Sequence, residues 1–343
     1  MDAHIGAVAE AMAGLATDLS SQFGAADSYA AAVTSVAGEV TARGIDADVY
    51  GRSPTVQAFE NDVAVLLGKD AGCFFMTGTL AQLTALRAHT SADGGGAGMQ
   101  LGGCGGMEGA DTLSFTGVAR VIAVHPTSHI AHHDCLRNGQ RQDALFHAHA
   151  AVNADGLRLV SFGMMHAVPS LTEFALMLAQ HRPCVVVLEL PQRMCGGRTV
   201  QWEDLVKMRE LATKAGAKLH MDGARLWEVQ PYYDRPLADI CALFDTVYVS
   251  FYKGLGAMAG SMLCGGTDVI DRCRSLKTAH GGTPFSVTTE VVHAQLMLAA
   301  HLSTFSHRYE RLVQFVDAIA AIPALSTILR FDPPSPQSCL IHG

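Results

Sequence analysis

The alternation of short apolar runs with longer amphipathic runs is the feature that most constrains how this chain can fold. Six short runs have the length and composition of buried strands, and they cover residues 71–76, 121–124, 183–190, 217–221, 246–250 and 261–264. Apolar residues recur at helical spacing over residues 80–89, 171–181, 202–216 and 286–305. Strands that alternate with helices of this length predict an α/β fold, with a mostly parallel sheet covered by helices on both faces.

The length of the chain predicts more than one structural part, because 343 residues usually exceed a single hydrophobic core. Apolar residues at helical spacing predict a helical segment over residues 1–45. A large α/β domain is expected over residues 46–285, with a glycine-rich surface insertion at residues 91–112. Residues 286–343 are expected to hold a long helix and only the start of a smaller C-terminal domain.

Charge and cysteine content exclude several classes of protein. The net charge of −8 argues against binding to nucleic acid, which needs a basic face. The nine cysteines include no C-x-x-C pair, so neither a zinc site nor a disulfide scaffold is indicated. The sequence shows no membrane-spanning stretch and no targeting segment. We therefore expect a cytoplasmic protein that binds neither a metal nor a membrane.

Two of the predicted strands end in residues that indicate chemistry. Asp222 and Arg225 follow the run 217–221, and Lys253 follows the run 246–250 among small residues. In open parallel sheets, ligands bind beyond the carboxyl ends of the strands. A lysine that forms a Schiff base and a carboxylate on a pyridine nitrogen are the minimal equipment for pyridoxal phosphate chemistry. The structural alternatives are a surface lysine, a helix N-cap at Asp222, and an Arg225 that pairs with Asp222 instead of a substrate carboxylate.

Two further segments are candidates for the same site. Thr77, Gly78 and Thr79 precede a predicted helix, whose free N–H groups and dipole favour a phosphate, although an ordinary capped helix has the same pattern. His129 follows the run 121–124 and could stack on a cofactor ring or act as a base. Most of the sixteen histidines are expected to be structural, so the position of His129 is the reason to favour it.

The order of these motifs resembles that of the low-specificity L-threonine aldolase and β-eliminating lyase family. The motifs that carry the resemblance are Asp48-Val49-Tyr50-Gly51, Thr77-Gly78-Thr79-Leu80-Ala81-Gln82, Ser128-His129-Ile130, Glu189-Leu190-Pro191-Gln192-Arg193, His220-Met221-Asp222-Gly223-Ala224-Arg225 and Tyr252-Lys253-Gly254-Leu255-Gly256. The resemblance implies the aspartate aminotransferase-like fold of fold-type I pyridoxal phosphate enzymes, which is built on a seven-stranded sheet.

The resemblance also implies a role for each candidate residue. Lys253 would be the Schiff-base lysine, Asp222 would pair with the pyridine nitrogen, and His129 would stack on the ring. The phosphate would be held by Thr77, Gly78 and Thr79. Arg225 would contact substrate or cofactor oxygens. Tyr50 would reach into the partner subunit's site in a homodimer or homotetramer.

The sequence departs from the family pattern at three places. No arginine follows the glycines at residues 281–282, so Lys277, or else Arg272 or Arg274, would have to help bind the phosphate. Asp134 stands where the family often has a longer acid. The small C-terminal domain, which usually supplies a second carboxylate-binding arginine, is expected to be incomplete.

The resemblance implies a carbon–carbon lyase of amino-acid metabolism. Threonine or a related β-hydroxy amino acid would be cleaved to glycine and an aldehyde, in threonine catabolism or glycine biosynthesis. A β-eliminating lyase on the same fold is the nearest alternative. A shortened, non-catalytic relative with a binding or assembly role is the alternative from another class. A nucleotide-binding oxidoreductase is disfavoured, because no G-x-G-x-x-G motif opens a helix after the first predicted strand.

Overall fold

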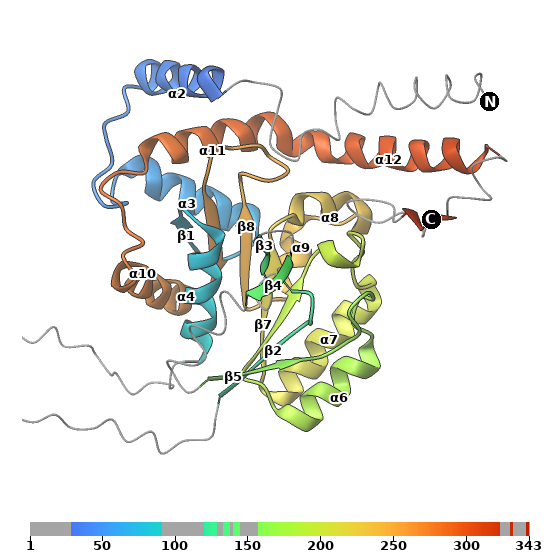
Figure 1. Cartoon of the computed structure of the whole chain (residues 1–343). Coiled ribbons are helices and arrows are strands. Elements are labelled where there is room, and N and C mark those ends of the chain that lie inside the picture. The colour runs from blue at the N-terminus through green and yellow to red at the C-terminus, as the bar shows by residue number, and fades with distance from the viewer. Residues whose placement is uncertain are drawn as a thin grey trace, which may run out of the picture.

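The computed structural model describes residues 29–90, 120–128, 133–137, 140–144, 157–322, 330–331 and 341–342. A seven-stranded sheet forms its centre, in the strand order β1-β9-β8-β7-β6-β2-β5 (Figure 1). The strands are β1 (Ala71–Phe75), β2 (Arg120–Val124), β5 (Leu157–Ser161), β6 (Val185–Glu189), β7 (Lys218–Gly223), β8 (Thr246–Ser250) and β9 (Ser261–Gly265). Only β9 runs against its two neighbours, β1 and β8, so the predicted mostly parallel sheet is confirmed.

Helices pack on both faces of the sheet, as predicted. Successive residues of a strand point to opposite faces, and the two faces accordingly belong to different apolar clusters. Phe74 of β1 belongs to the apolar cluster that includes residues of α3, α7 and α9, whereas its neighbours Cys73 and Phe75 belong to the cluster that includes residues of α4 and α10. The helices that carry these contacts are α3 (Pro54–Leu66), α4 (Gly78–Thr90), α6 (Leu171–His181), α7 (Trp202–Ala215), α8 (Leu226–Tyr233), α9 (Leu237–Ala242) and α10 (Thr267–Ala279).

Local sequence explains where several helices begin and end. Ser53 caps α3 by accepting from the Val56 N–H, and Pro54 occupies the first turn, where its missing N–H costs nothing. Ser170 and Glu173 form a reciprocal capping box at the start of α6. Gly216 ends α7 with a left-handed φ of 72°, a conformation that glycine adopts without strain.

The helix predicted over residues 286–305 is interrupted, which corrects the expectation of one long helix. The chain instead forms α11 (Thr288–His301), a 3-10 turn η3 (Leu302–Thr304) and α12 (Phe305–Ala320). The Thr304 hydroxyl donates to the His301 carbonyl at 2.7 Å. Such a local side-chain bond offers the backbone an alternative to regular helix geometry.

The N-terminal and C-terminal expectations are only partly within the described residues. The second predicted N-terminal helix is present as α2 (Tyr29–Arg43). The first predicted helix and the glycine-rich insertion lie outside the described residues. Near the C-terminus, β10 (Arg330–Phe331) pairs with β11 (Ile341–His342). In the middle of the chain, β3 (His133–Arg137) pairs with β4 (Gln140–Ala144) in a separate two-stranded sheet. Within the described residues, no helix combines the length and apolar character needed to cross a bilayer. The domain boundaries remain a prediction.

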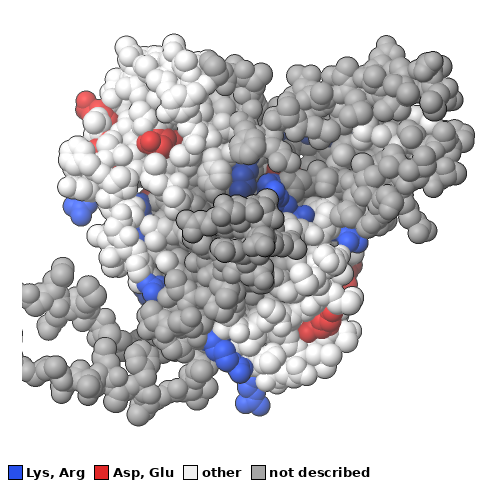
Figure 2. Space-filling view, viewed as in Figure 1, with Lys and Arg blue, Asp and Glu red and all other residues white. Residues whose placement is uncertain are grey.

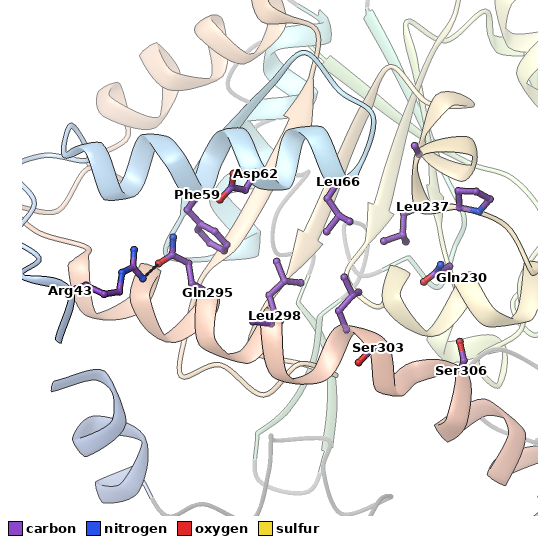
Figure 3. Close-up of a pocket in the computed structure, with 14 residues that line it drawn as sticks. Arg43, Phe59, Asp62, Leu66, Gln230, Leu237, Gln295, Leu298, Ser303 and Ser306 are labelled. Atoms are coloured by element: carbon purple, nitrogen blue, oxygen red, sulfur yellow. Dashed lines mark hydrogen bonds between the residues drawn. The ribbon is translucent and has the colours of Figure 1, made fainter. Parts of the chain in front are cut away.

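A groove of about 920 Å³ lies between α3, α8, α9 and α11 (Figure 3). Its walls are mainly apolar, with Phe59, Leu66, Leu237 and Leu298 among the side chains that line it. None of the predicted site residues that the structure describes lines this groove.

Candidate active site

The carboxyl ends of β6, β7 and β8 bring the predicted site together. Glu189 of β6 is the register partner of Asp222 in β7, and Asp222 is the register partner of Tyr248 in β8. The Ser250 hydroxyl, at the end of β8, donates to the Ala224 carbonyl at 2.6 Å. This bond ties the turn after β7 to the start of the segment that carries Lys253, so the predicted meeting of the Asp222 and Lys253 segments is present in the structure.

Lys253 lies partly buried among charged groups. Burial lowers its pKa, the Asp222 and Glu189 carboxylates oppose that shift, and Arg225 and Arg193 add to it. Its ammonium nitrogen is 5.8 Å from the centre of the Tyr252 ring. A lysine with a lowered pKa can present a neutral amine to a carbonyl carbon near neutral pH, which is what a Schiff-base lysine requires.

Asp222 is buried, with 2% of its surface exposed, yet it is well supplied with donors. The Gln82 side-chain amide donates to Oδ2 at 2.6 Å, and the Ala224 N–H donates to Oδ1 at 3.2 Å. These two donors hold the carboxyl group in one orientation. The side chain is therefore suited to act as a fixed carboxylate opposite a protonated ring nitrogen.

Two other acids, Glu189 and Glu228, lie at this site, and the sequence predicts no role for either of them. Burial, followed by the nearby Asp222 charge, raises the pKa of Glu189 to about 8. Burial raises the pKa of Glu228 to about 7, and its Oε2 has no hydrogen-bond partner among the described residues. A side chain at Gly254 would come within 2.5 Å of Glu228 Oε1, so Glu228 lies directly against the loop that carries Lys253.

The sequence contained a signal for one of these acids but not for the other. Glu189 lies near the carboxyl end of the predicted strand 183–190, just as Asp222 directly follows the predicted strand 217–221, so its position could have indicated it. Glu228 lies beside Leu226, Trp227 and Val229, all of which are fully buried. A single acid in an apolar helix gives no indication of its role until the fold shows what it faces.

Arg225 occupies the N-cap position of α8. Burial lowers the pKa of its guanidinium, and the carboxylates of Glu228, Glu189 and Asp222 oppose that shift. Figure 2 shows Lys and Arg atoms near the centre of the visible face, in the region where Figure 1 places β8 and α8. Cationic groups in this region are suited to bind anionic phosphate or carboxylate groups.

The predicted phosphate segment lies at the start of α4. The Leu80 N–H donates to the Thr77 hydroxyl at 3.4 Å, and the helix begins at Gly78. Any side chain at Gly78 would collide with the Tyr248 hydroxyl, which is 3.1 Å from the Tyr252 hydroxyl. The structure thus brings the start of α4 next to the residue that precedes Lys253. Thr79 lies in the same first turn.

Lys277 and Arg274 of α10 already have partners in the structure. The Lys277 ammonium donates to the Phe74 carbonyl at 2.7 Å and lies over the Phe75 ring. Arg274 pairs with Glu60 at 2.7 Å. A phosphate-binding role for Lys277 therefore remains a prediction, and it would require this ammonium to serve a second partner.

Neither histidine of the predicted segment confirms the stacking role. His129 lies outside the described residues. His125 is buried, and both of its ring nitrogens have partners: Thr127 Oγ1 at 2.8 Å and the Ala167 carbonyl at 2.9 Å. His125 is therefore a structural histidine, and the assignment of His129 remains a prediction.

Tyr50 projects from a turn that is fixed by Asp48. The Asp48 carboxylate accepts from the Gly51 N–H at 2.6 Å and from the Ser53 N–H at 2.8 Å. The Tyr50 ring packs edge-on against Phe285, with 53% of Tyr50 and 64% of Phe285 exposed. An exposed aromatic pair held on a rigid turn is compatible with contact to a partner subunit.

The described residues fit pyridoxal phosphate. Lys253 offers an amine of lowered pKa, Asp222 offers a carboxylate held by two donors, and the first turn of α4 offers the exposed residues Thr77 and Thr79. The unpartnered Glu228 Oε2 adds a buried polar atom beside the same loop. This donor set contains a partner for the aldehyde, for the ring nitrogen and for the phosphate.

Comparison with known proteins indicates the same family as the sequence motifs. A model of the β-eliminating lyase family matches residues 25–324. An Arabidopsis thaliana protein named "Probable low-specificity L-threonine aldolase 2" is 30% identical over 238 residues, which are 69% of this chain and 59% of that protein. The chain thus spans less than two thirds of this relative's length.

Two solved structures share the fold across most of the chain. A candidate L-allo-threonine aldolase from Listeria monocytogenes EGD-E superposes with a TM-score of 0.74 at 25% identity, over 92% of this chain and 76% of that one. A candidate aromatic amino acid β-eliminating lyase/threonine aldolase from Exiguobacterium sp. 255-15 gives a TM-score of 0.72 at 27% identity, over 92% and 77%. The chain therefore belongs to the β-eliminating lyase family and has the fold-type I architecture of pyridoxal phosphate-dependent, threonine aldolase-like proteins.

Proposed function

We propose that the chain cleaves L-threonine, L-allo-threonine or a related β-hydroxy amino acid between Cα and Cβ, giving glycine and an aldehyde. The observation that carries this proposal is the junction of the Lys253 loop with buried, donor-supplied Asp222 at the carboxyl ends of β7 and β8. The relatives named as threonine aldolases support the choice of substrate class.

Each predicted site residue has a defined task in this proposal. Bound pyridoxal phosphate would accept the electron pair of the bond that breaks. Lys253 provides the attachment point, and Asp222 keeps a proton on the ring nitrogen. Arg225 holds the substrate carboxylate, which fixes the orientation of the Cα–Cβ bond. His129, or a water that it orients, takes the proton from the β-hydroxyl group.

The remaining assignments concern anchoring and assembly. Thr77, Gly78 and Thr79 would hold the phosphate at the start of α4, with Lys277 nearby. Tyr50 would complete the site of a partner subunit in a homodimer or homotetramer. The setting proposed for this reaction is cytoplasmic amino-acid metabolism, in threonine breakdown or glycine formation.

A β-elimination is the second candidate, because the family model that matches the chain is described as β-eliminating lyase. The same lysine and carboxylate would serve, but a β-substituent would leave instead of an aldehyde. The products then differ: a 2-oxo acid (2-oxobutyrate from threonine, pyruvate from serine) and ammonia replace glycine and the aldehyde.

Product analysis distinguishes these reactions. The full chain is loaded with pyridoxal phosphate and incubated separately with L-threonine, L-allo-threonine and L-serine, and glycine, aldehyde, 2-oxobutyrate, pyruvate and ammonia are quantified. We expect equal amounts of glycine and acetaldehyde from a threonine isomer, and none from Lys253→Ala. Ammonia with 2-oxobutyrate from threonine, or with pyruvate from serine, as the main products would replace the aldolase proposal with β-elimination. Bound cofactor without any product would favour a non-catalytic relative.

A further inference from the structure

A continuous row of polar side chains, all buried except the half-buried His89, leads away from Asp222 along one face of the sheet. Gln82 Nε2 lies 2.6 Å from Asp222 Oδ2, and Gln82 Oε1 lies 3.0 Å from His220 Nε2. His220 Nδ1 lies 2.8 Å from Thr246 Oγ1, which in turn lies 2.8 Å from His89 Nε2. Each of the five groups is therefore within hydrogen-bond distance of the next.

The fold explains why these residues meet. His220 and Asp222 are two apart in β7, so both side chains point to the same face. Thr246 is the register partner of His220 in the adjacent strand β8. Gln82 and His89 lie seven residues apart on α4, so they occupy the same side of that helix. The row thus runs between α4 and the sheet, from the carboxyl end of β7 toward its amino end.

The chemistry of the groups fixes the direction of every bond. An ionised carboxylate only accepts, so the Gln82 amide must donate to Asp222 and present its oxygen to His220. His220 then donates from Nε2, and its Nδ1 accepts from the Thr246 hydroxyl. Because that hydroxyl has given its only proton to His220, it accepts from His89 Nε2. All four bonds therefore donate toward Asp222.

Both histidines favour the neutral form that this arrangement requires. Burial lowers the pKa of His220 to about 3, with neighbouring His89 adding to the effect. Burial lowers the pKa of His89 to about 4, with Asp245 opposing and Lys218 and Arg272 adding to the shift. A neutral imidazole carries one N–H and one acceptor nitrogen, which is the pattern that the row uses.

We propose that this row is a polar relay that positions the Asp222 carboxylate and sets the proton affinity of the cofactor's ring nitrogen. The relay consists of Gln82, His220, Thr246 and His89, and these four are positioning residues because they act through Asp222. The inference rests on the proposed cofactor site but not on the choice of substrate. Hydrogen bonds in a series polarise one another, so removing the Thr246 hydroxyl should weaken the hydrogen bond that Asp222 accepts from Gln82.

The direct test measures the ring nitrogen itself. The full chain is loaded with ¹⁵N-labelled pyridoxal phosphate, and the ring-nitrogen chemical shift is recorded for wild type, Gln82→Leu and Thr246→Val. Without the Gln82 donor the carboxylate is less stable. The equilibrium constant for proton transfer from the ring nitrogen to Asp222 should therefore rise by about 10-fold or more. Thr246→Val should give a smaller shift in the same direction.

Matched variants separate the relay from general damage to the core. Thr246→Ser keeps the hydroxyl and should restore the wild-type signal. Thr84→Val makes the same change at a buried threonine of α4 that bonds to the Ala81 carbonyl, outside the relay, and should leave the signal unchanged. An unchanged signal in Thr246→Val, or an equal change in Thr84→Val, would overturn the proposal. Melting temperatures of all variants verify folding.

A second readout does not depend on cofactor binding. ¹⁵N spectra of histidine-labelled full chain, before cofactor is added, report the tautomer of each ring. The relay predicts that His220 and His89 are neutral near pH 6 and carry the proton on Nε2. A proton on His220 Nδ1, or a charged His220 at that pH, contradicts the relay. If wild type binds no cofactor, the proposed function fails while this readout still decides the relay.

Discussion

Two regions of this protein bury carboxyl groups, and the regions differ in how completely they supply those groups with hydrogen-bond partners. Beneath β1, Glu60 is 3% exposed, and both of its oxygens have close partners: the Phe74 N–H at 2.7 Å and Arg274 at 2.7 Å. At the carboxyl ends of β6 to β8, Glu228 is enclosed beside the Lys253 loop with one oxygen unpartnered. Glu60 therefore connects structural elements, whereas Glu228 keeps one oxygen that can accept or donate a further hydrogen bond.

The difference shows how burial alone fails to identify a functional acid. A buried carboxyl with complete partners connects the groups that it bonds, and its removal is costly because those partners are left unsatisfied. A buried carboxyl without them keeps its proton to higher pH, and such perturbed groups concentrate at functional sites. The incomplete partners of Glu228 and its place beside Lys253 are therefore the informative features.

The largest effect on activity is expected at Asp222. Both of its carboxylate oxygens have hydrogen-bond partners, unlike those of Glu228. Asp222→Asn keeps the size of the side chain but cannot hold a proton on the ring nitrogen, so kcat should fall on the order of 100-fold or more. Steady-state kinetics on cofactor-loaded protein measure this loss. Near-normal kcat in a variant that binds the cofactor would remove Asp222 from the proposed chemistry.

The structural region should respond through stability instead. Glu60→Ala leaves the Phe74 N–H unsatisfied and removes the Arg274 partner, so the free energy of unfolding should fall by about 2–3 kcal/mol. Urea unfolding of cofactor-free protein measures this change, and Glu60→Gln, which can still accept from Phe74, should lose less. A marked loss of kcat per folded molecule would contradict the structural assignment of Glu60.

Glu228 should make stability depend on pH. Burial raises its folded-state pKa from the ordinary 4.5 to about 7. Between these values the unfolded chain releases the proton and the folded chain retains it, so this group's effect lowers stability as pH rises through that window. Glu228→Gln should therefore gain stability relative to wild type between about pH 4.5 and pH 7, by at most about 3 kcal/mol.

Urea unfolding of wild type and Glu228→Gln at several pH values tests this prediction. Glu189 remains in both proteins, so its own contribution should cancel in the difference. A stability difference that does not change with pH would mean that Glu228 is already ionised in the folded protein.

The smallest effect is expected at the surface, from Tyr50. Because half of its side chain is exposed, Tyr50→Ala should change stability little, and it should reduce activity only if the residue serves a partner's site. Mixing Tyr50→Ala protomers with Lys253→Ala protomers tests this, because a hybrid would contain one site with both residues intact. Hybrids that form but regain no activity would exclude a shared site.

The parts of the fold that the sequence predicts best are its buried strands and well-capped helices. The run that forms β8 is buried at every position, and α6 begins at its capping box, so the predicted bounds of both agree with the structure. β5 was not predicted, because an edge strand with an arginine at 158 lacks a continuous apolar run. The break between α11 and α12 depends on a local hydroxyl contact that periodicity does not reveal.

The candidate site shows a similar division. Asp222 and Lys253 could be predicted because each follows an apolar run that becomes a strand. Gln82 and His220 were part of recognised motifs, but their contact with Asp222 depends on how α4 lies across β7. The unpartnered state of Glu228 depends wholly on tertiary packing.

The most direct measurement asks which lysine holds the cofactor. The full chain is incubated with pyridoxal phosphate, reduced with borohydride to fix any Schiff base, digested and mapped by mass spectrometry. We predict a single stoichiometric pyridoxyl modification on Lys253, lost in Lys253→Ala. Modification mainly at another lysine, or none above the level of Lys253→Ala, would contradict the account.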